Sequence, residues 1–482
     1  MSTHTPTPEQ AAIIEAAATT TDNLIVNALA GAAKTSTIIM MSEAVRIPSL
    51  ALAFNKRIAL ELQERMPAHV TCKTLNALGH AAVGQMLGKR LNVKADKRRW
   101  LLREYINNVA DEKEKADLFD AFQDLTRAIS HGVACGYVPD SYSRGPGKRL
   151  CDDDEFFSTR LDFEPTRAEI DAIRTVSYEG IAEALRGNID FDDQIFISTL
   201  WPASFPAFPL VYVDETQDLS LLQHKMLEKV AHKRLIAVGD PCQAIYGFRG
   251  AHEDSMARLA SSRNMRELFL SVSFRLPTSV ADHVRWRAPH IASPEWAKPG
   301  TVTTLSEWSG DTLPESAAII CRNNAPLFSC ALRLLAEGKR PELIGNDLVT
   351  GLVKEMKRLS KDMTLEQDDT LALIDAWLEK AKRKSRNPGA VDDKAECMRL
   401  FVRASDTLGI AIARVEQIAN MKGSIKLMTG HKSKGLEFPH VYFLDEHLIN
   451  PERDPQANNL RYVIATRAQE TLTYITSEGY NA

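Results

Sequence analysis

The chain has 482 residues, of which 44% are apolar and 25% charged, and its formal net charge at pH 7 is −4. This length predicts two to four domains, because single cores rarely grow beyond about 250–300 residues. The composition excludes a disordered chain, no apolar run is long enough for a membrane-spanning helix, and mild acidity argues against a general nucleic-acid binder. Seven cysteines without a C-x-x-C pair suit a reducing compartment. We therefore expect a soluble protein of the cytoplasm (bacterial or phage-infected cell), or of the nucleus if the source is eukaryotic.

Charge is unevenly distributed along the chain. Residues 88–103 and 379–387 are strongly basic, whereas residues 151–157, CDDDEFF, are acidic. Such runs are more often solvated surfaces than binding sites. We therefore interpret the basic runs as solvated faces and the acidic run as a solvated loop, rather than as polyanion or metal sites.

Short apolar runs alternate with segments of helical spacing. We expect buried strands within residues 23–29, 49–54, 209–215, 234–240, 316–322 and 440–446. Residues 35–45, which follow the first run after a short loop, have the length and spacing of a helix. Alternation of this kind predicts an α/β fold with parallel sheets covered by helices on both faces.

Two charged, helix-like stretches interrupt this alternation, so we expect two α/β domains with mainly helical insertions. The predicted boundaries are residues 1–80 and 188–270 for the first domain, 81–187 for its insertion, 271–347 and 421–482 for the second domain, and 348–420 for a smaller insertion.

The segment NALAGAAKTST, after the first predicted strand, resembles a phosphate-binding loop of the pattern G-x-x-x-x-G-K-[ST]. Lys34 and Thr35 supply the cation and the hydroxyl, but Ala28 and Ala33 replace both glycines. Gly31 is available for a turn, and Ala33 adjoins the helix start, where we expect a negative φ. On this segment alone, an ATP site and an ordinary strand-to-helix turn both stay open.

Two later segments carry polar residues at the ends of apolar strands. In LVYVDETQD, Asp214 would bind Mg²⁺ through water and Glu215 would act as general base. In VGDPCQAIYGFRGA, Gln243 could sense the γ-phosphate. The same segment offers aromatic and cationic groups at Tyr246, Phe248 and Arg249. Together the three segments favour an ATP site.

The order of these segments resembles the motifs of superfamily 1 helicases of the UvrD/Rep type, in particular the helicase part of F-box DNA helicases. The resemblance extends through nearly the whole chain, in the order TPEQAAII, NALAGAAKTS, ALAFNKRIALEL, CKTLNALGH, FDDQI, VDETQD, GDPCQAIYGFRGA, LSVSFRLP, GHKSKGLEF and LRYVIATRAQETL. It implies two RecA-like parallel-sheet domains that use ATP and Mg²⁺.

The resemblance also implies roles for individual residues. The implied nucleotide contacts are Gln10 and Phe274 at adenine, Glu437 at the ribose, and Ala30, Gly31, Ala32, Ala33, Lys34, Thr35 and Ser36 at the phosphates. The implied catalytic groups are Lys34, Glu215, Gln243 and the two arginines Arg275 and Arg467, with Thr35 and Asp214 as Mg²⁺ ligands. The implied nucleic-acid contacts are Phe54, Asn55, Thr74, Tyr246, Phe248, Arg249, Gly430, His431 and Lys432.

The sequence departs from the family pattern at a few positions. Alanine is common at the position of Ala28, but Ala33 stands where glycine is usual, Thr216 where alanine is usual, and Phe248 where tryptophan is frequent. Every charged catalytic role is filled. We therefore interpret Ala33 as a tolerated variant.

The resemblance implies an ATP-dependent 3′→5′ DNA helicase or single-stranded DNA translocase. Its partners would be single-stranded and partial-duplex DNA, it would be a monomer, and it would serve DNA repair or replication. The small second insertion leaves unwinding and translocation as alternatives. A non-hydrolysing nucleotide- and nucleic-acid-binding module with an altered loop is the second hypothesis. A nuclease fusion is a third, which we do not expect because the chain ends soon after the last motif.

Overall fold

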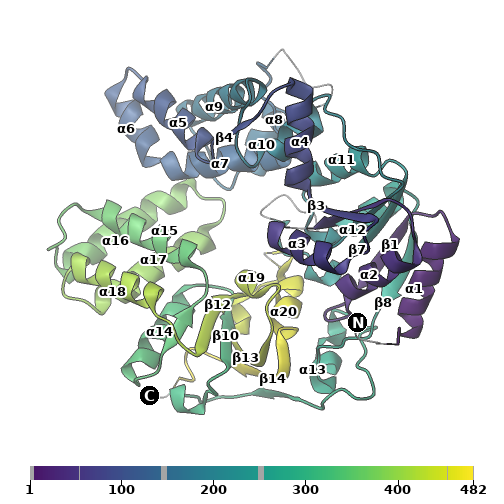
Figure 1. The fold of residues 1–482 in the computed structure, drawn as a ribbon. Coiled ribbons are helices and arrows are strands. Elements are labelled where there is room, and N and C mark those ends of the chain that lie inside the picture. The colour runs from purple at the N-terminus through teal and green to yellow at the C-terminus, as the bar shows by residue number, and fades with distance from the viewer. Residues whose placement is uncertain (1–4, 54, 143–148, 248–253, 453, 481–482) are drawn as a thin grey trace. The chain divides into compact units, whose positions relative to one another are not determined.

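The computed structural model describes residues 5–53, 55–142, 149–247, 254–452 and 454–480. The chain divides into two compact units, Met1–Ser271 and Val272–Ala482, hereafter unit 1 and unit 2. Each unit contains one six-stranded sheet (Figure 1). The strand pairs in both sheets are all parallel within the described residues, which confirms the predicted α/β class.

The sheet of unit 1 has the order β3-β2-β6-β7-β1-β8. Its strands are β1 (Leu24–Ala28), β2 (Ser49–Ala53), β3 (Val70–Thr74), β6 (Leu210–Val213), β7 (Arg234–Gly239) and β8 (Arg266–Leu270). The four predicted strands are the four central ones, and their residues are nearly all buried. The two edge strands, β3 and β8, were not predicted, because exposed polar residues interrupt their apolar pattern.

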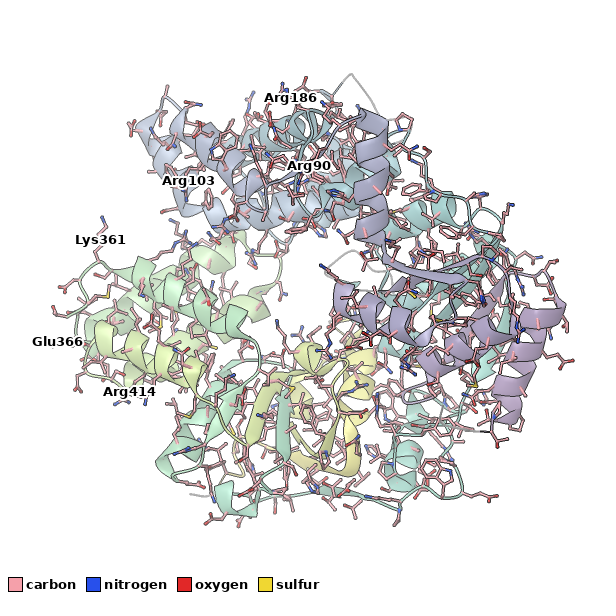
Figure 2. The ribbon with its side chains drawn as sticks, in the orientation of Figure 1. Arg90, Arg103, Arg186, Lys361, Glu366 and Arg414 are labelled. Atoms are coloured by element: carbon pink, nitrogen blue, oxygen red, sulfur yellow. The ribbon has the colours of Figure 1, made fainter. Side chains whose placement is uncertain are left out.

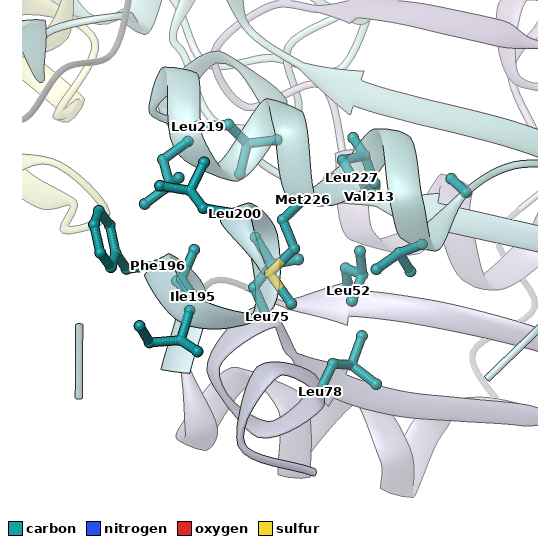
Figure 3. Close-up of a cluster of buried hydrophobic side chains, with 14 of the residues drawn as sticks. Leu52, Leu75, Leu78, Ile195, Phe196, Leu200, Val213, Leu219, Met226 and Leu227 are labelled. Atoms are coloured by element: carbon teal, nitrogen blue, oxygen red, sulfur yellow. The ribbon is translucent and has the colours of Figure 1, made fainter. Parts of the chain in front are cut away.

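Helices cover both faces of this sheet. They are α1 (Pro8–Thr19), α2 (Lys34–Ala44), α3 (Lys56–Arg65), α4 (Leu75–Leu87), α10 (Asp193–Leu200), α11 (Leu221–Val230) and α12 (Ser255–Ser262). Alternate strand residues enter two separate clusters: Leu50 and Leu52 join one, and Ala51 joins the other. The first cluster joins β2 and β6 to α4, α10 and α11 (Figure 3).

A helical insertion follows α4 and has a core of its own. It contains α5 (Lys97–Asn107), α6 (Glu112–Asp120), α7 (Phe122–Cys135), α8 (Asp153–Glu155), a π-helical turn η1 (Phe156–Arg160), α9 (Arg167–Leu185), and the parallel pair β4 (Asn92–Val93) and β5 (Asn188–Ile189).

Buried ion pairs connect the start of this insertion to the chain that leaves it. Lys97 Nζ pairs with Asp193 and donates to the Gly180 carbonyl at 2.8 Å. Arg98 pairs with Asp190 and, at 2.5 Å, with Asp193 Oδ1. All four side chains are buried. The interpretation of residues 88–103 as a wholly solvated basic face was therefore wrong at Lys97 and Arg98, because two aspartates distant in sequence neutralise them.

The acidic run also differs from the expected solvated loop. Asp153 is buried in α8, accepts a hydrogen bond from Tyr137 Oη at 2.7 Å and pairs with Arg174 Nε at 2.8 Å. Its neighbours Asp152 and Asp154 are exposed. One carboxylate of the run thus has a structural role that its local sequence does not reveal.

Unit 2 has a sheet of order β11-β12-β10-β13-β14-β9. Its strands are β9 (Thr301–Thr304), β10 (Ala317–Cys321), β11 (Pro341–Leu343), β12 (Ile425–Thr429), β13 (Phe438–Leu444) and β14 (Ala468–Ile475). Its helices are α13 (Thr278–His283), α14 (Ala325–Ala336), α15 (Asn346–Leu359), α16 (Gln367–Lys384), α17 (Pro388–Arg403), α18 (Leu408–Asn420), α19 (Gly430–Ser433) and α20 (Ala457–Ala465). Only β10 and β13 were predicted, and helices α15 to α18 lie between β11 and β12.

Single 3₁₀ turns complete the fold: η2 (Thr216–Asp218), η3 (Pro241–Gln243), η5 (Val284–Trp286), η6 (Gly310–Thr312) and η7 (Glu446–Leu448). Among the helices that the structure describes, none combines the length and apolar character needed to cross a bilayer.

The contact between α4 and α10 depends on a glycine. A Cβ added to Gly79 would lie 1.9 Å from the backbone oxygen of Gln194 and 2.9 Å from Ser198 Oγ. We predict that Gly79→Ala lowers the free energy of unfolding by about 3 kcal/mol, since two packed helices must separate to admit the methyl group. Urea unfolding measures the change.

Gly84→Ala on the same helix is the matched control. A Cβ there has its nearest neighbour at 3.6 Å, an ordinary contact. Alanine should be neutral or stabilise α4 by up to about 1 kcal/mol because of its helix propensity. Equal destabilisation by both variants would contradict the proposed close approach at Gly79.

Candidate functional site

The loop between β1 and α2 has two residues in the left-handed region. Gly31 has φ 76°, and Ala33 has φ 56° and ψ 41°. The expectation of a negative φ at Ala33 was therefore wrong: the turn into α2 needs a left-handed residue directly before Lys34. For a residue with a Cβ this conformation costs roughly 1–2 kcal/mol. The strain explains why glycine is usual at this position.

The first turn of α2 is chemically suited to an anion. Ala33 occupies the N-cap position and provides no side-chain hydrogen bond to the helix. The first N–H groups of a helix have no partner within the helix, and they carry the positive end of its dipole. Lys34 begins this helix and adds a full charge. A phosphate group fits this arrangement.

The end of β6 lies beside the start of α2. The Thr35 hydroxyl donates a hydrogen bond to Asp214 Oδ2 at 2.9 Å, and Lys34 Nζ lies 3.7 Å from Glu215 Oε1. The Lys34 and Glu215 side chains are 13% and 33% exposed, so solvent and a ligand can reach them. The hydroxyl and the carboxylate are hard oxygen donors, which Mg²⁺ prefers. The structure thus brings together the four residues predicted for phosphate, metal and base.

A chain of hydrogen bonds extends from Glu215 to the end of β7. Gln217 Nε2 donates to Glu215 Oε2 at 2.6 Å, and Gln217 Oε1 accepts from the Asp240 backbone N–H at 3.0 Å. Gln243 Nε2 donates to Asp240 Oδ2 at 2.7 Å. The predicted residue Gln243 is therefore held by a buried carboxylate. Sequence analysis missed Gln217 and Asp240 as site residues, although both lie inside the quoted motifs.

Burial changes the acidity of the carboxylates at this site. Desolvation, together with the neighbouring Glu215, raises the pKa of Asp214 to about 6, although Lys34 and the Thr35 hydrogen bond oppose the shift. Desolvation also raises the pKa of Asp240 above its ordinary value, against the effects of Lys34 and Gln243. Two carboxylates with raised pKa values beside a lysine are typical of a functional site.

Gln10 connects the N-terminal helix to α2. Its Oε1 accepts from the Thr7 N–H at 3.0 Å in a capping box, and its Nε2 donates to Thr37 Oγ1 at 3.0 Å. The side chain is buried. These bonds fix Gln10 near the loop, but its predicted contact with adenine stays a prediction. The loop residues Ala30 and Ala32 are buried as well, and Ser36 follows in the first turn of α2.

Two of the unit 1 residues predicted to contact nucleic acid cap helices. Asn55 Oδ1 accepts from the Ile58 N–H at 2.9 Å and caps α3, and Thr74 Oγ1 accepts from the Ala77 N–H at 3.1 Å and caps α4. Tyr246 is half-buried. Phe54, Phe248 and Arg249 lie outside the described residues.

Unit 2 gathers three of its predicted site residues. Arg275 Nε donates to Glu437 Oε2 at 2.7 Å. Arg467 Nη1 donates to the carbonyl of Leu436 at 3.1 Å, and its Nε donates to the Val463 carbonyl at 2.8 Å. Arg467 is only 1% exposed. The segment around Glu437 therefore joins both arginines, with one partly open and the other enclosed.

An exposed aromatic pair lies next to Arg275. Phe274 is 38% exposed, and its ring centroid lies 6.2 Å from that of Trp296, which is 68% exposed. Sequence analysis did not select Trp296, because no quoted motif contains it. The pair gives unit 2 an aromatic surface where the resemblance places an adenine contact.

The remaining predicted residues of unit 2 belong to α19. Gly430 is buried, and an added Cβ would lie 2.7 Å from Ile464 Cδ1 and 2.8 Å from Leu460 Cδ1. His431 is half-buried and Lys432 is exposed. Gly430 thus permits α19 to approach α20 closely, while its predicted place near nucleic acid stays a prediction.

The strain at Ala33 predicts opposite effects of two substitutions. Ala33→Gly removes a left-handed penalty of roughly 1–2 kcal/mol but loosens the unfolded chain by about 0.4–1 kcal/mol. We expect a net gain in the free energy of unfolding of about 0.5 kcal/mol. Ala33→Val should lose about 1–2 kcal/mol, because branched side chains tolerate this region poorly.

Urea titration of the whole chain measures these changes in the free energy of unfolding. Ala32→Gly is the control, since Ala32 is buried and has no positive φ. It should destabilise the protein. A gain at Ala32 equal to that at Ala33 would contradict the assignment of strain to Ala33.

The raised pKa of Asp214 predicts a pH-dependent stability. Its folded-state pKa of about 6 lies above the ordinary 3.8, so the folded state holds a proton between about pH 4 and pH 6 that the unfolded state releases. The contribution of this carboxyl is therefore fully present below pH 4 and lost as the pH rises to 6.

We expect the free energy of unfolding of the wild type, measured against that of Asp214→Asn without Mg²⁺, to fall by about 1–3 kcal/mol across this window and to stay constant above it. Asp240→Asn keeps the Asp214 carboxyl, so this variant should still lose stability over the same pH window. A constant difference between wild type and Asp214→Asn from pH 4 to pH 7 would refute the shift.

Comparison with known proteins supports the motif order. Residues 187–263 match the UvrD/REP helicase N-terminal domain, and residues 424–475 match the UvrD-like helicase C-terminal domain. The chain is 23% identical over 499 residues to F-box DNA helicase 1 of Gallus gallus, which covers 92% of this chain and 46% of that protein. It is 21% identical over 519 residues to F-box DNA helicase protein 1 of Schizosaccharomyces pombe, with 97% and 57% covered.

A third relative, the ATP-dependent DNA helicase PcrA of Leuconostoc citreum, is 23% identical over 346 residues, which covers 64% of this chain and 43% of that protein. The chain thus spans about half the length of the F-box relatives it matches. Both matched domains include segments of the described site, namely the ends of β6 and β7 in unit 1 and the Glu437–Arg467 region in unit 2. The chain thus matches both the N-terminal and the C-terminal domain model of UvrD-like helicases, and these relatives are DNA helicases, consistent with the UvrD/Rep-like helicases of superfamily 1.

Proposed function

We propose that this protein is an ATP- and Mg²⁺-dependent DNA motor that moves 3′→5′ along a single strand and acts on single-stranded and partial-duplex DNA. The observation that carries the proposal is the contact of α2 with the end of β6, where Thr35 meets Asp214 and Lys34 meets Glu215. This pairing joins a phosphate-binding helix start to a metal-binding carboxylate and a base.

The residues fit the chemistry of nucleotide hydrolysis. Thr35 Oγ1 and Asp214 would hold Mg²⁺, which neutralises phosphate charge when it is bound. The first turn of α2 would bind the outer phosphates through its N–H groups and Lys34. Mg²⁺ keeps several water ligands and takes one or two ligands from the protein, so two oxygen donors are sufficient.

The ion pair of Lys34 with Glu215 suggests how the base is controlled. A carboxylate beside an ammonium group is a weaker base, because the positive charge stabilises its ionised form. A nucleotide phosphate competes for Lys34 and would release Glu215 to accept a proton from the attacking water. The Gln217 hydrogen bond at 2.6 Å keeps the other Glu215 oxygen in place. Gln243, which Asp240 holds, would report the γ-phosphate.

We assign to unit 2 the two cations that stabilise the developing charge, Arg275 and Arg467. Their common connection to the Leu436–Phe438 segment supports joint action, since Arg467 contacts Leu436 and Arg275 contacts Glu437. Phe274 would stack on adenine. Loss of the γ-phosphate would then change the hold of each unit on DNA, which is a two-state change driven by charge.

The first test removes the lysine. We predict that Lys34→Ala lowers DNA-stimulated ATP hydrolysis by at least about 100-fold, because the preorganised charge on the phosphates is lost. Lys233→Ala, at an exposed lysine before β7, is the matched control and should retain full activity. An unchanged rate in Lys34→Ala would remove Lys34 from the mechanism.

Turnover distinguishes the two hypotheses. Because Ala33 is strained, a module that binds nucleotide without hydrolysing it is the alternative hypothesis. Such a module would show nucleotide binding but no turnover with or without single-stranded DNA. Strand displacement with 3′-tailed, 5′-tailed and RNA-tailed duplexes tests polarity and substrate. Displacement of 5′-tailed duplexes alone would reverse the proposed direction.

A further inference from the structure

The helical insertion of unit 1 contains a cavity that the nucleotide chemistry does not use. It has a volume of about 580 Å³ and lies between α5, α6 and α9, which are neighbours in Figure 1. Ligand pockets commonly have volumes of about 300–1,000 Å³. We call it the acidic groove, and its defining residues are Leu101, Glu104, Val109, Glu114, Val176 and Glu179.

The floor of the acidic groove is apolar. Val176 is 1% exposed, and Leu101 and Val109 are partly buried at the edge of the core of the insertion. Tyr105, four residues after Leu101 on the same face of α5, also lines the cavity. Partly exposed apolar side chains at a cavity floor favour an apolar group of a ligand, because binding removes that surface from water.

The rim of the groove is negatively charged and not neutralised. Glu104 and Glu114 are exposed and Glu179 is half-buried. No lysine or arginine in the described part of the chain forms an ion pair with any of the three. Glu104 of α5, Glu114 of α6 and Glu179 of α9 line a single cavity. Each is therefore available to a cation from outside.

Nearby cations of the insertion have other partners. Arg99 and Arg103 of α5, of which Arg103 is labelled in Figure 2, lie over the Phe122 ring at 5.5 Å and 6.0 Å. Arg174 of α9 pairs with Asp153, and Lys115 of α6 pairs with Glu112. The negative field also affects Tyr105, whose pKa is raised by burial and by Asp171 and Glu114.

Charge complementarity selects the occupant. Phosphates are repelled by the carboxylates that line the cavity, Asp111 included, so the groove does not suit a DNA backbone. Lysine and arginine cover apolar surface with their aliphatic stems while their charged ends reach acidic groups. We propose that the acidic groove docks a basic segment of a partner protein in which lysine or arginine alternates with branched apolar side chains. Its apolar residues lie on the floor and its cations meet Glu104, Glu114 and Glu179.

A site-specific probe tests the proposal on the full chain. All seven cysteines are buried, so Thr175→Cys, on an exposed lining residue, places one accessible thiol for an environment-sensitive fluorophore at the groove. The probe ligand is a synthetic ten-residue peptide of lysine pairs separated by leucine. We expect a saturable change in fluorescence that weakens as salt is added.

Two variants separate charge from apolar contact. Glu104→Gln/Glu114→Gln/Glu179→Gln should weaken peptide binding by at least about tenfold, and Leu101→Gln, which leaves the charge unchanged, should also weaken it. The matched control Glu112→Gln/Asp117→Asn/Asp154→Asn removes three exposed charges of the same insertion outside the groove. It should change affinity less than twofold. Circular dichroism verifies folding, and ATP hydrolysis, which does not involve the groove, should be equal in all variants.

Several results would overturn the proposal. Equal peptide binding by the triple glutamine variant and the wild type would show that the three carboxylates do not contribute to peptide binding. Equal loss in the control variant would show general attraction to an acidic protein. Displacement of the peptide by spermidine at equal charge concentration would identify a site for small polyamines. Self-association that the triple variant abolishes, measured by sedimentation, would identify a second copy of the chain as the occupant. Each result stands whether or not the protein hydrolyses ATP.

Discussion

The hydrogen bond between Thr35 and Asp214 is the contact on which the site of unit 1 depends. The carboxyl ends of parallel strands meet at one edge of a sheet, so β1, β6 and β7 deliver their following loops to the same place. Thr35 and Asp214 fix α2 against β6, and Gln217 extends the connection to β7. The polar groups of this site thus hold one another through hydrogen bonds.

The same site contains backbone strain. Two of the four described non-glycine residues with positive φ are Ala33 and Glu215, the residue before the lysine and the expected base. Strained residues persist only where surrounding contacts determine the conformation. Here the buried strands on both sides and the Thr35–Asp214 bond do so. The loop therefore keeps the shape of a phosphate-binding turn although a methyl group replaces the usual hydrogen.

Sequence predicted the centre of each sheet better than its edges. Runs such as residues 235–238 are apolar throughout because both faces of a central parallel strand are buried. Strand β8, with the sequence RELFL, is largely exposed, so composition alone did not identify it. Among site residues, the motif order located Lys34, Asp214 and Glu215. It did not locate Trp296, which no motif includes, and it could not reveal the sign of φ at Ala33, which depends on the path of the whole turn.

The insertion of unit 1 shows why net charge is a poor guide to a surface. Two cations of its basic run, Lys97 and Arg98, are buried against Asp190 and Asp193, and Arg99 and Arg103 lie over the Phe122 ring, whereas Lys89, Arg90 and Lys94 are exposed. The neighbouring carboxylates Glu104 and Glu179 have no such partners. The carboxylates of the groove come from residues after the basic run and from α9, so the same insertion presents charges of both signs at different places. The sign of the surface charge depends on which charged side chains form ion pairs inside the folded protein. These ion pairs connect residues about 90 positions apart in the sequence, as between Arg98 and Asp190.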